Sequence, residues 1–216
     1  MKMCFAYLST TQPRKEFFMN ICVFGSSSEK INKVYLDSAY SLGKAIAQKG
    51  HTMIYGAGKY GVMGAAARGV VSQGGKLIGV TPRFFDDLDV LYENDSETIY
   101  TETMRERKGI MEDKSDAFIV CAGGMGTFEE FFEVLTLKQL RRHEKPIIIY
   151  NVNGYYDNMI KMMNFAVEER FMSDECNLLY TLAETEDEIF DQLKNYVPYT
   201  YNKYNYLDWS KDDKNG

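Results

Sequence analysis

Residues 116–135, DAFIVCAGGMGTFEEFFEVL, decide the fold class of this chain. After Asp116 the stretch contains a continuously apolar run, AFIVC, which predicts a strand over 116–121 that is covered by helices on both faces. A glycine-rich loop follows, and a helix is predicted behind it over 127–142. The buried stripe of that helix is marked by apolar residues at helical spacing, namely Phe128, Phe131, Phe132 and Leu135. The order of strand, loop and helix is the repeating unit of a parallel sheet.

The same unit recurs along most of the chain. We predict strands over 20–25, 51–55, 76–80, 116–121 and 146–150, with a weaker one near 178–182. Helices are predicted over 30–49, 61–73, 103–114, 127–142, 155–171 and 184–195, and 82–102 is a less regular segment. The pattern predicts an α/β fold, with a single doubly wound, Rossmann-like domain whose mainly parallel sheet has helices on both faces.

The two ends of the chain fall outside this pattern. Residues 1–18 are interpreted as an N-terminal extension, 19–198 as the Rossmann-like domain and 199–216 as a polar C-terminal tail. Ligands bind such sheets outside the carboxyl ends of the strands. A functional site is therefore expected in the loops after Gly25, Tyr55, Val80, Cys121 and Tyr150.

Composition argues against several classes of protein. The 216 residues carry a net charge of −6, whereas a nucleic-acid partner usually demands a basic stripe. No apolar run reaches the roughly 18 residues of a membrane span, and the first residues lack a signal-peptide pattern, which favours a cytoplasmic protein without a membrane partner. Four widely spaced cysteines and two histidines favour neither a zinc site, a disulfide framework nor a Ser-His-Asp unit, so we expect no metal and no cofactor.

The first glycine loop, 56–64, matches G-x-G-x-x-G through Gly56, Gly58 and Gly61, between a predicted strand and a predicted helix. Such glycines let a phosphate approach the backbone at a helix N-terminus. A dinucleotide would need an acidic residue at the end of the next strand, but the first acid is Asp86, which argues against NAD. The alternative that these glycines serve only helix–sheet packing stays open.

The second glycine loop, 121–127, stands in the same strand-to-helix context. Two such loops favour one anionic ligand lying across the strand ends. Thr127 and Glu130 fit a capping box with Thr127 as the N-cap, and Thr103 and Glu106 fit another. In the first turn of a helix, the dipole would favour the ionised form of Glu130, which suits stabilising a cation or activating water.

Three motifs in order carry a resemblance to a known family. Residues 56–64, MRERK over 104–108 and AGGMGTFEE over 122–130 resemble the LONELY GUY family, with its P-G-G-x-G-T-x-x-E hallmark and an upstream M-H-x-R-K. NVNGYYD over 151–157 is similar to the segment after the family's next strand. The resemblance, which covers roughly residues 20 to 197, implies that 19–198 is a nucleotide-monophosphate-binding catalytic domain. It implies a phosphoribohydrolase that releases the base from a cytokinin riboside 5′-monophosphate, and a homodimer.

The resemblance also implies roles for single residues. Arg107 and Glu130 match the family's catalytic pair, although by spacing alone the basic residues are more typical of a solvated helix face and Glu130 also fits a helix cap. Substrate contacts are implied for the positions that match family ligand contacts, namely Asp89, Lys108, Gly123, Gly124, Met125, Gly126, Thr127 and Thr136. Two positions depart from the family pattern, because Ala122 replaces its proline and Arg105 its histidine. The second departure bears on which base is preferred.

Other classes of protein would share these residues. A general purine (AMP) nucleosidase would need all of them, and only a comparison of substrates separates it from a cytokinin-specific enzyme. A non-catalytic nucleotide or cofactor carrier would have the phosphate-binding loops without turnover. A pyridoxal-phosphate lysine decarboxylase would need a Schiff-base lysine, and no lysine is marked as one.

Overall fold

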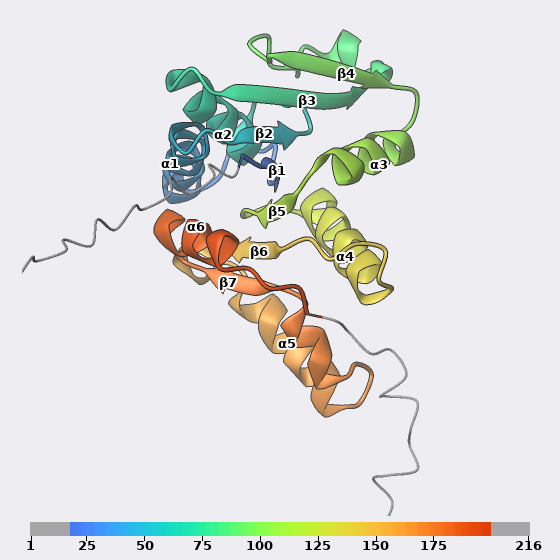
Figure 1. Cartoon of the computed structure of the whole chain (residues 1–216). Helices are drawn as coiled ribbons and strands as arrows, with labels where there is room; N and C mark the ends of the chain where they lie inside the picture. Colours follow the sequence, from blue (N-terminus) through green and yellow to red (C-terminus); the bar gives the residue numbers. More distant parts are fainter. Residues whose placement is uncertain (1–17, 200–216) are drawn as a thin grey trace, which may run out of the picture.

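The computed structural model describes residues 18–199 and contains one seven-stranded parallel sheet (Figure 1). Its strand order is β4-β3-β2-β1-β5-β6-β7. The strands are β1 (Asn20–Phe24), β2 (Thr52–Tyr55), β3 (Lys76–Pro82), β4 (Glu97–Thr101), β5 (Ala117–Val120), β6 (Ile147–Tyr150) and β7 (Thr181–Ala183). The predicted single α/β domain with a parallel sheet is confirmed. The extension and the tail expected at the chain ends fall, except for residues 18 and 199, outside the described residues.

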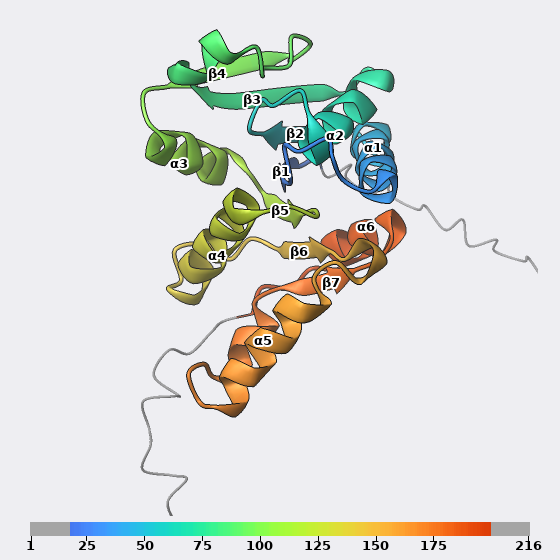
Figure 2. The same ribbon diagram turned by 180° about the vertical axis from the view of Figure 1, so that it is seen from behind.

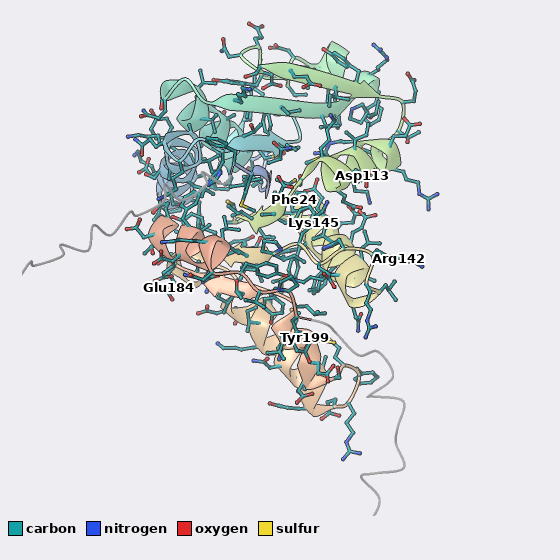
Figure 3. All side chains as sticks on the ribbon, in the orientation of Figure 1. Phe24, Asp113, Arg142, Lys145, Glu184 and Tyr199 are labelled. Carbon is teal, nitrogen blue, oxygen red and sulfur yellow. The ribbon has the colours of Figure 1, made fainter. Side chains whose placement is uncertain are left out.

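Helices cover both faces of the sheet, as predicted. One core joins the sheet to α1 (Lys33–Gln48), α2 (Gly61–Ser72) and α6 (Glu186–Lys194). A second core joins the other face to α3 (Met104–Lys114), α4 (Met125–Gln139) and α5 (Asp157–Glu168). In both views α3 and α4 lie on the side away from α1 and α2 (Figure 2). Alternate residues of β1 enter the two cores, Val23 on the first face and Phe24 on the second (Figure 3).

Burial on both faces accounts for the apolar strands. The residues of β5 and β6 are all buried, which explains why their sequences contain no alternating polar positions. Each buried Val, Ile or Phe side chain of these strands contributes about 1.5–3 kcal/mol when it leaves water. Within the described part of the chain, no helix is long and apolar enough to cross a membrane.

The segment 82–102, predicted to be less regular, contains a strand that the sequence did not reveal. After the short 3-10 helix η1 (Arg83–Leu88), β4 pairs in parallel with β3, with Val80 opposite Ile99. β4 lies at an edge of the sheet and only Thr101 is buried in it, so it has no continuous apolar run. The weak strand predicted near 178–182 is β7 at the opposite edge, and the 3-10 helix η3 (Asp174–Leu178) precedes it.

The strand order reverses beside β1. The chain winds outward from β1 to β4 on one side, crosses back through α3, and winds outward from β5 to β7 on the other. β1 and β5 are direct neighbours, and the loops that follow them are joined by a hydrogen bond from Ser26 N–H to the Ala122 carbonyl at 3.1 Å. The carboxyl ends of β1 and β5 thus form the topological switch point where doubly wound sheets bind ligands.

Candidate active site

Arg107 of α3 and Glu130 of α4 meet on the same face of the sheet. Nη1 of Arg107 donates a hydrogen bond to Oε1 of Glu130 at 3.0 Å, and the residues are only 6% and 8% exposed. Nε of Arg107 also donates to the carbonyl of Val80 in β3 at 3.1 Å. The structure therefore brings together the two residues for which the family resemblance implies catalysis, as one buried ion pair.

The glycine at position 56 makes room for this pair. A Cβ atom on Gly56 would collide with Nη2 of Arg107, because the guanidinium lies directly against the loop after β2. Gly61 has a φ of +62°, and a Cβ there would lie 2.5 Å from the Ser26 carbonyl oxygen. Contacts within the chain thus account for both glycines, but these contacts are with the Arg107 side chain and the loop after β1 and not between a helix and the sheet. A contact of Gly56, Gly58 or Gly61 with a ligand stays a prediction.

The Glu130 carboxyl lies in a different position on its helix from the one predicted. Helix α4 begins at Met125 with Gly124 as N-cap, so Glu130 belongs to the second turn and the predicted Thr127–Glu130 capping box is wrong. Burial raises the pKa of Glu130, and the Arg107 guanidinium opposes part of that rise. Arg107, and not a first-turn dipole, is therefore the group that favours the ionised form against the effect of burial. The other predicted capping box, Thr103 with Glu106, is present.

Thr127 packs inside α4 instead of capping it. A Cβ on Gly123 would collide with the Thr127 hydroxyl, so the Thr127 side chain fits here only because residue 123 is a glycine. Thr127 is buried, while Phe132, which the helical spacing placed in the buried stripe, is 41% exposed. Val134 is buried instead, because the elements packed against α4 decide which of its sides faces the core.

The second glycine loop presents an open helix N-terminus. Gly124, Met125 and Gly126 are exposed, and no atom would lie within 4 Å of a Cβ on Gly124 or Gly126. The first N–H groups of a helix have no acceptor within that helix, and its dipole adds positive partial charge. This end of α4 therefore has the properties of an anion site.

Lys108 has carboxylate partners on α4. Its Nζ donates to Glu129 and forms an ion pair with Glu133 at 2.7 Å, with only 16% of the side chain exposed. These two acids raise the pKa of Lys108, against the lowering effect of its burial. Lys108 thus joins α3 to α4 through its ion pairs. The contact of Lys108 with substrate that the resemblance implies stays a prediction.

Two further implied substrate ligands are exposed, unlike the buried Arg107–Glu130 pair. Thr136 is exposed, and at 100° per residue it sits on a face of α4 about 120° away from Glu130. Asp89 is exposed, has a φ of 49°, and forms an ion pair with Lys59 at 2.7 Å. The backbone next to Asp89 bonds to the first glycine loop, because Lys59 N–H donates to the Val90 carbonyl at 2.8 Å.

The loop after Gly25 is one of the loops in which a site was expected, but none of its residues was predicted to belong to the site. Ser26, Ser27 and Ser28 follow β1 at the switch point, and the latter two are exposed. The sequence feature that could have indicated them is the run of three serines after the first strand. It points to the site only when β1 and β5 are known to be neighbours.

A cavity of about 940 Å³ lies far from these residues. It is lined by His51, Lys145 and Phe190 among others, at the amino ends of β1, β2 and β6, and Lys145 is labelled in Figure 3. Ligands in doubly wound sheets bind at the carboxyl ends. The cavity contains neither glycine loop nor the Arg107–Glu130 pair, so its size does not make it the candidate site.

Comparison with known proteins agrees with the motifs. The family model described as "Possible lysine decarboxylase" matches residues 63–193. The cytokinin riboside 5′-monophosphate phosphoribohydrolase LOG2 of Arabidopsis thaliana is 35% identical over 184 residues, covering 85% of this chain and 86% of that protein. LOG of Oryza sativa subsp. japonica, which carries the same enzyme name, is 36% identical over 185 residues, covering 86% and 76%.

Solved structures support the fold. The molybdenum cofactor carrier protein from Chlamydomonas reinhardtii superposes with a TM-score of 0.62 at 22% identity, covering 81% of this chain and 95% of that one. The molybdenum cofactor binding protein from Rippkaea orientalis gives a TM-score of 0.62, also at 22% identity, with coverage of 84% and 98%. At this identity the likeness concerns the fold alone. The family model and the plant relatives establish more, and this chain belongs to the LONELY GUY family.

Proposed function

We propose that this chain is a phosphoribohydrolase that cleaves the N-glycosidic bond of a nucleoside 5′-monophosphate, with a cytokinin riboside 5′-monophosphate as the narrower candidate substrate. The observation that carries the proposal is the buried Arg107–Glu130 ion pair, on two helices that meet at the switch point next to an open helix N-terminus. Membership of the LONELY GUY family supports it, since the plant relatives carry that enzyme name.

The chemistry asks for a carboxylate near the anomeric carbon. Water adds to C1′ of the ribose, the bond from C1′ to the base nitrogen breaks, and the base leaves with a proton, giving ribose 5-phosphate. By analogy with glycoside hydrolysis, the transition state resembles an oxocarbenium cation. Glu130 stabilises that cation or activates the water. Arg107, bonded to Val80 on its other side, fixes the direction in which the carboxylate points.

The 5′-phosphate supplies binding energy away from the reacting bond. The N–H groups at the start of α4, around Gly124 and Gly126, are exposed and receive the dianion. Holding the phosphate there places the glycosidic bond beside Glu130 and lowers the entropic part of the barrier. Nucleosides lack this anchor and should react far more slowly than their monophosphates.

The test compares substrates on the purified full-length protein. We expect release of free base and ribose 5-phosphate from AMP or N6-isopentenyl-AMP, with kcat/KM at least about a hundredfold above that for the matching nucleoside. Equal rates on nucleoside and monophosphate would contradict the phosphate site. Tight binding of monophosphates without turnover would identify a carrier.

The same substrate panel also sets the base specificity. A preference for N6-isopentenyl-AMP over AMP identifies a cytokinin enzyme, and similar rates identify a general purine nucleosidase. The proposal includes a homodimer, as the family resemblance implies. Light scattering of the purified protein at micromolar concentration checks the dimer, and a monomer mass would remove that part of the proposal.

A further inference from the structure

Three consecutive carbonyl groups in the second glycine loop are all hydrogen-bonded. Along residues 121–123 they accept, in order, from the Tyr156 hydroxyl at 2.8 Å, from Ser26 N–H at 3.1 Å and from the Tyr155 hydroxyl at 2.6 Å. Two of the three donors are therefore adjacent tyrosines from the loop after β6. These residues belong to the NGYYD stretch, for which the sequence indicated no chemical role.

Local backbone geometry puts the two tyrosines in place. β5 and β6 are neighbouring strands, so their carboxyl-end loops lie side by side. The loop after β6 turns sharply at Asn153 and Gly154, with φ values of 53° and 67°, through the 3-10 helix η2 (Val152–Gly154). The Asn151 side chain accepts from Tyr156 N–H at 2.7 Å, which fixes the end of that turn.

The two aromatic rings have different surroundings, since Tyr155 is 39% exposed and packs by ring contacts, whereas Tyr156 is buried. Tyr156 is 1% exposed, and burial raises the pKa of its hydroxyl, which keeps it a hydrogen-bond donor. The Tyr155 ring meets the Tyr35 ring of α1 edge to face, with centroids 5.5 Å apart. A hydroxyl on a ring fixed in this way loses little conformational entropy when it bonds to the loop.

Orientation of the loop carbonyls matters to an anion. A peptide unit that directs its C=O toward a phosphate repels it, whereas one that directs its N–H toward it binds it. We infer that Tyr155 and Tyr156 are positioning residues for the phosphate site, which keep the carbonyls of Gly123 and Cys121 turned away from the bound phosphate. The inference rests on the proposed function, because it assumes that the phosphate binds at the start of α4.

The test removes single hydroxyl groups. Tyr155→Phe should weaken binding of ribose 5-phosphate, measured by calorimetry, by between about threefold and tenfold, the range expected for one hydrogen bond. With AMP as substrate, KM should rise by the same factor while kcat stays within about twofold. Tyr156→Phe should act in the same direction, with a lower melting temperature because its carbonyl partner is buried.

Tyr35→Phe is the matched control, because it removes a hydroxyl from the same aromatic contact and that hydroxyl has no hydrogen-bond partner among residues 18–199. It should leave binding and KM unchanged. Wild-type affinity for ribose 5-phosphate in Tyr155→Phe, or an equal loss in Tyr35→Phe, would overturn the inference. Calorimetry needs no turnover, so a protein that binds ribose 5-phosphate in a Tyr155-dependent way but does not hydrolyse AMP refutes the proposed reaction and leaves the positioning role standing.

Discussion

Replacing Glu130 by glutamine removes a negative charge and keeps nearly the same shape. The amide oxygen can still accept the hydrogen bond that Arg107 Nη1 donates to Oε1 at 3.0 Å. The start of α4 is untouched, because Gly124 is the N-cap and Glu130 makes no capping bond there. Any large loss of activity would therefore come from the charge and not from a broken helix.

The surroundings of Glu130 determine how much the substitution changes stability and how much it changes the reaction barrier. Glu130→Gln leaves a buried guanidinium opposite a neutral amide, but it also removes a carboxylate whose pKa burial has raised. These contributions oppose each other, so the free energy of unfolding should change by about 1 kcal/mol. Loss of the group that faces a developing cation costs about 3–4 kcal/mol in the barrier, or roughly 10²–10³ in kcat.

The assay measures ribose 5-phosphate release from AMP under saturating substrate, together with ribose 5-phosphate binding by calorimetry. Glu129→Gln is the control, because it neutralises the adjacent carboxylate, whose side chain is 53% exposed and contacts Lys108 instead of Arg107. It should keep kcat within about threefold. A Glu130→Gln protein that binds ribose 5-phosphate and retains more than about a third of the wild-type kcat would refute the role given to Glu130.

Three further perturbations test other parts of the reasoning. Gly56→Ala should lower kcat about tenfold or more with the fold intact by circular dichroism, since its Cβ displaces the Arg107 guanidinium, whereas Gly109→Ala, with open space around its Cβ, should leave kcat unchanged. Burial raises the pKa of Asp95 from its ordinary 3.8 to about 6. The folded chain thus holds this proton more tightly than the unfolded chain, and the Asp95 contribution to stability falls as the pH rises from about 4 to about 6. Asp95→Asn, which can still accept from the Tyr55 hydroxyl, should raise the free energy of unfolding by about 1 kcal/mol at pH 7 and much less at pH 4, and equal gains in urea melts at both pH values would contradict this. Turnover should survive dialysis against EDTA, because no step of the proposed mechanism uses a metal, and a loss that added Mg²⁺ restores would show otherwise.

The sheet was predictable wherever strands are buried on both faces. β5 and β6 are covered by helices from two sides, and this environment selects the unbroken apolar runs that the sequence shows. β4 was missed for the converse reason, since Glu97 is exposed and the strand has only β3 beside it. Its pairing is stabilised by backbone hydrogen bonds to β3. Such bonds do not depend on residue type, so the amino-acid composition of β4 does not reveal them.

The start of α4 shows that a capping-box pattern in the sequence is not enough to predict where a helix begins. Thr127 and Glu130 satisfy the capping-box pattern as well as Thr103 and Glu106 do, yet only the second pair forms one. In α4 the helix begins at Met125, so Thr127 lies inside the first turn, where its side chain packs over Gly123, and the cap worth about 1 kcal/mol does not form. The pattern fits two helix starts, and it does not decide between them.

The site itself depends on the one crossover that reverses the direction of the sheet. A glycine loop before a helix N-terminus occurs in many α/β proteins and by itself indicates only an anion site. Helix α3 carries the chain from β4 back to β5, so Arg107 can bond to Val80 in the first half of the sheet and to Glu130 in the second. Gly56 supplies the space between the two halves. The pair can therefore form only where both halves meet beside the second glycine loop, and that arrangement, more than either glycine loop, is what supports the proposed cleavage of a nucleoside monophosphate.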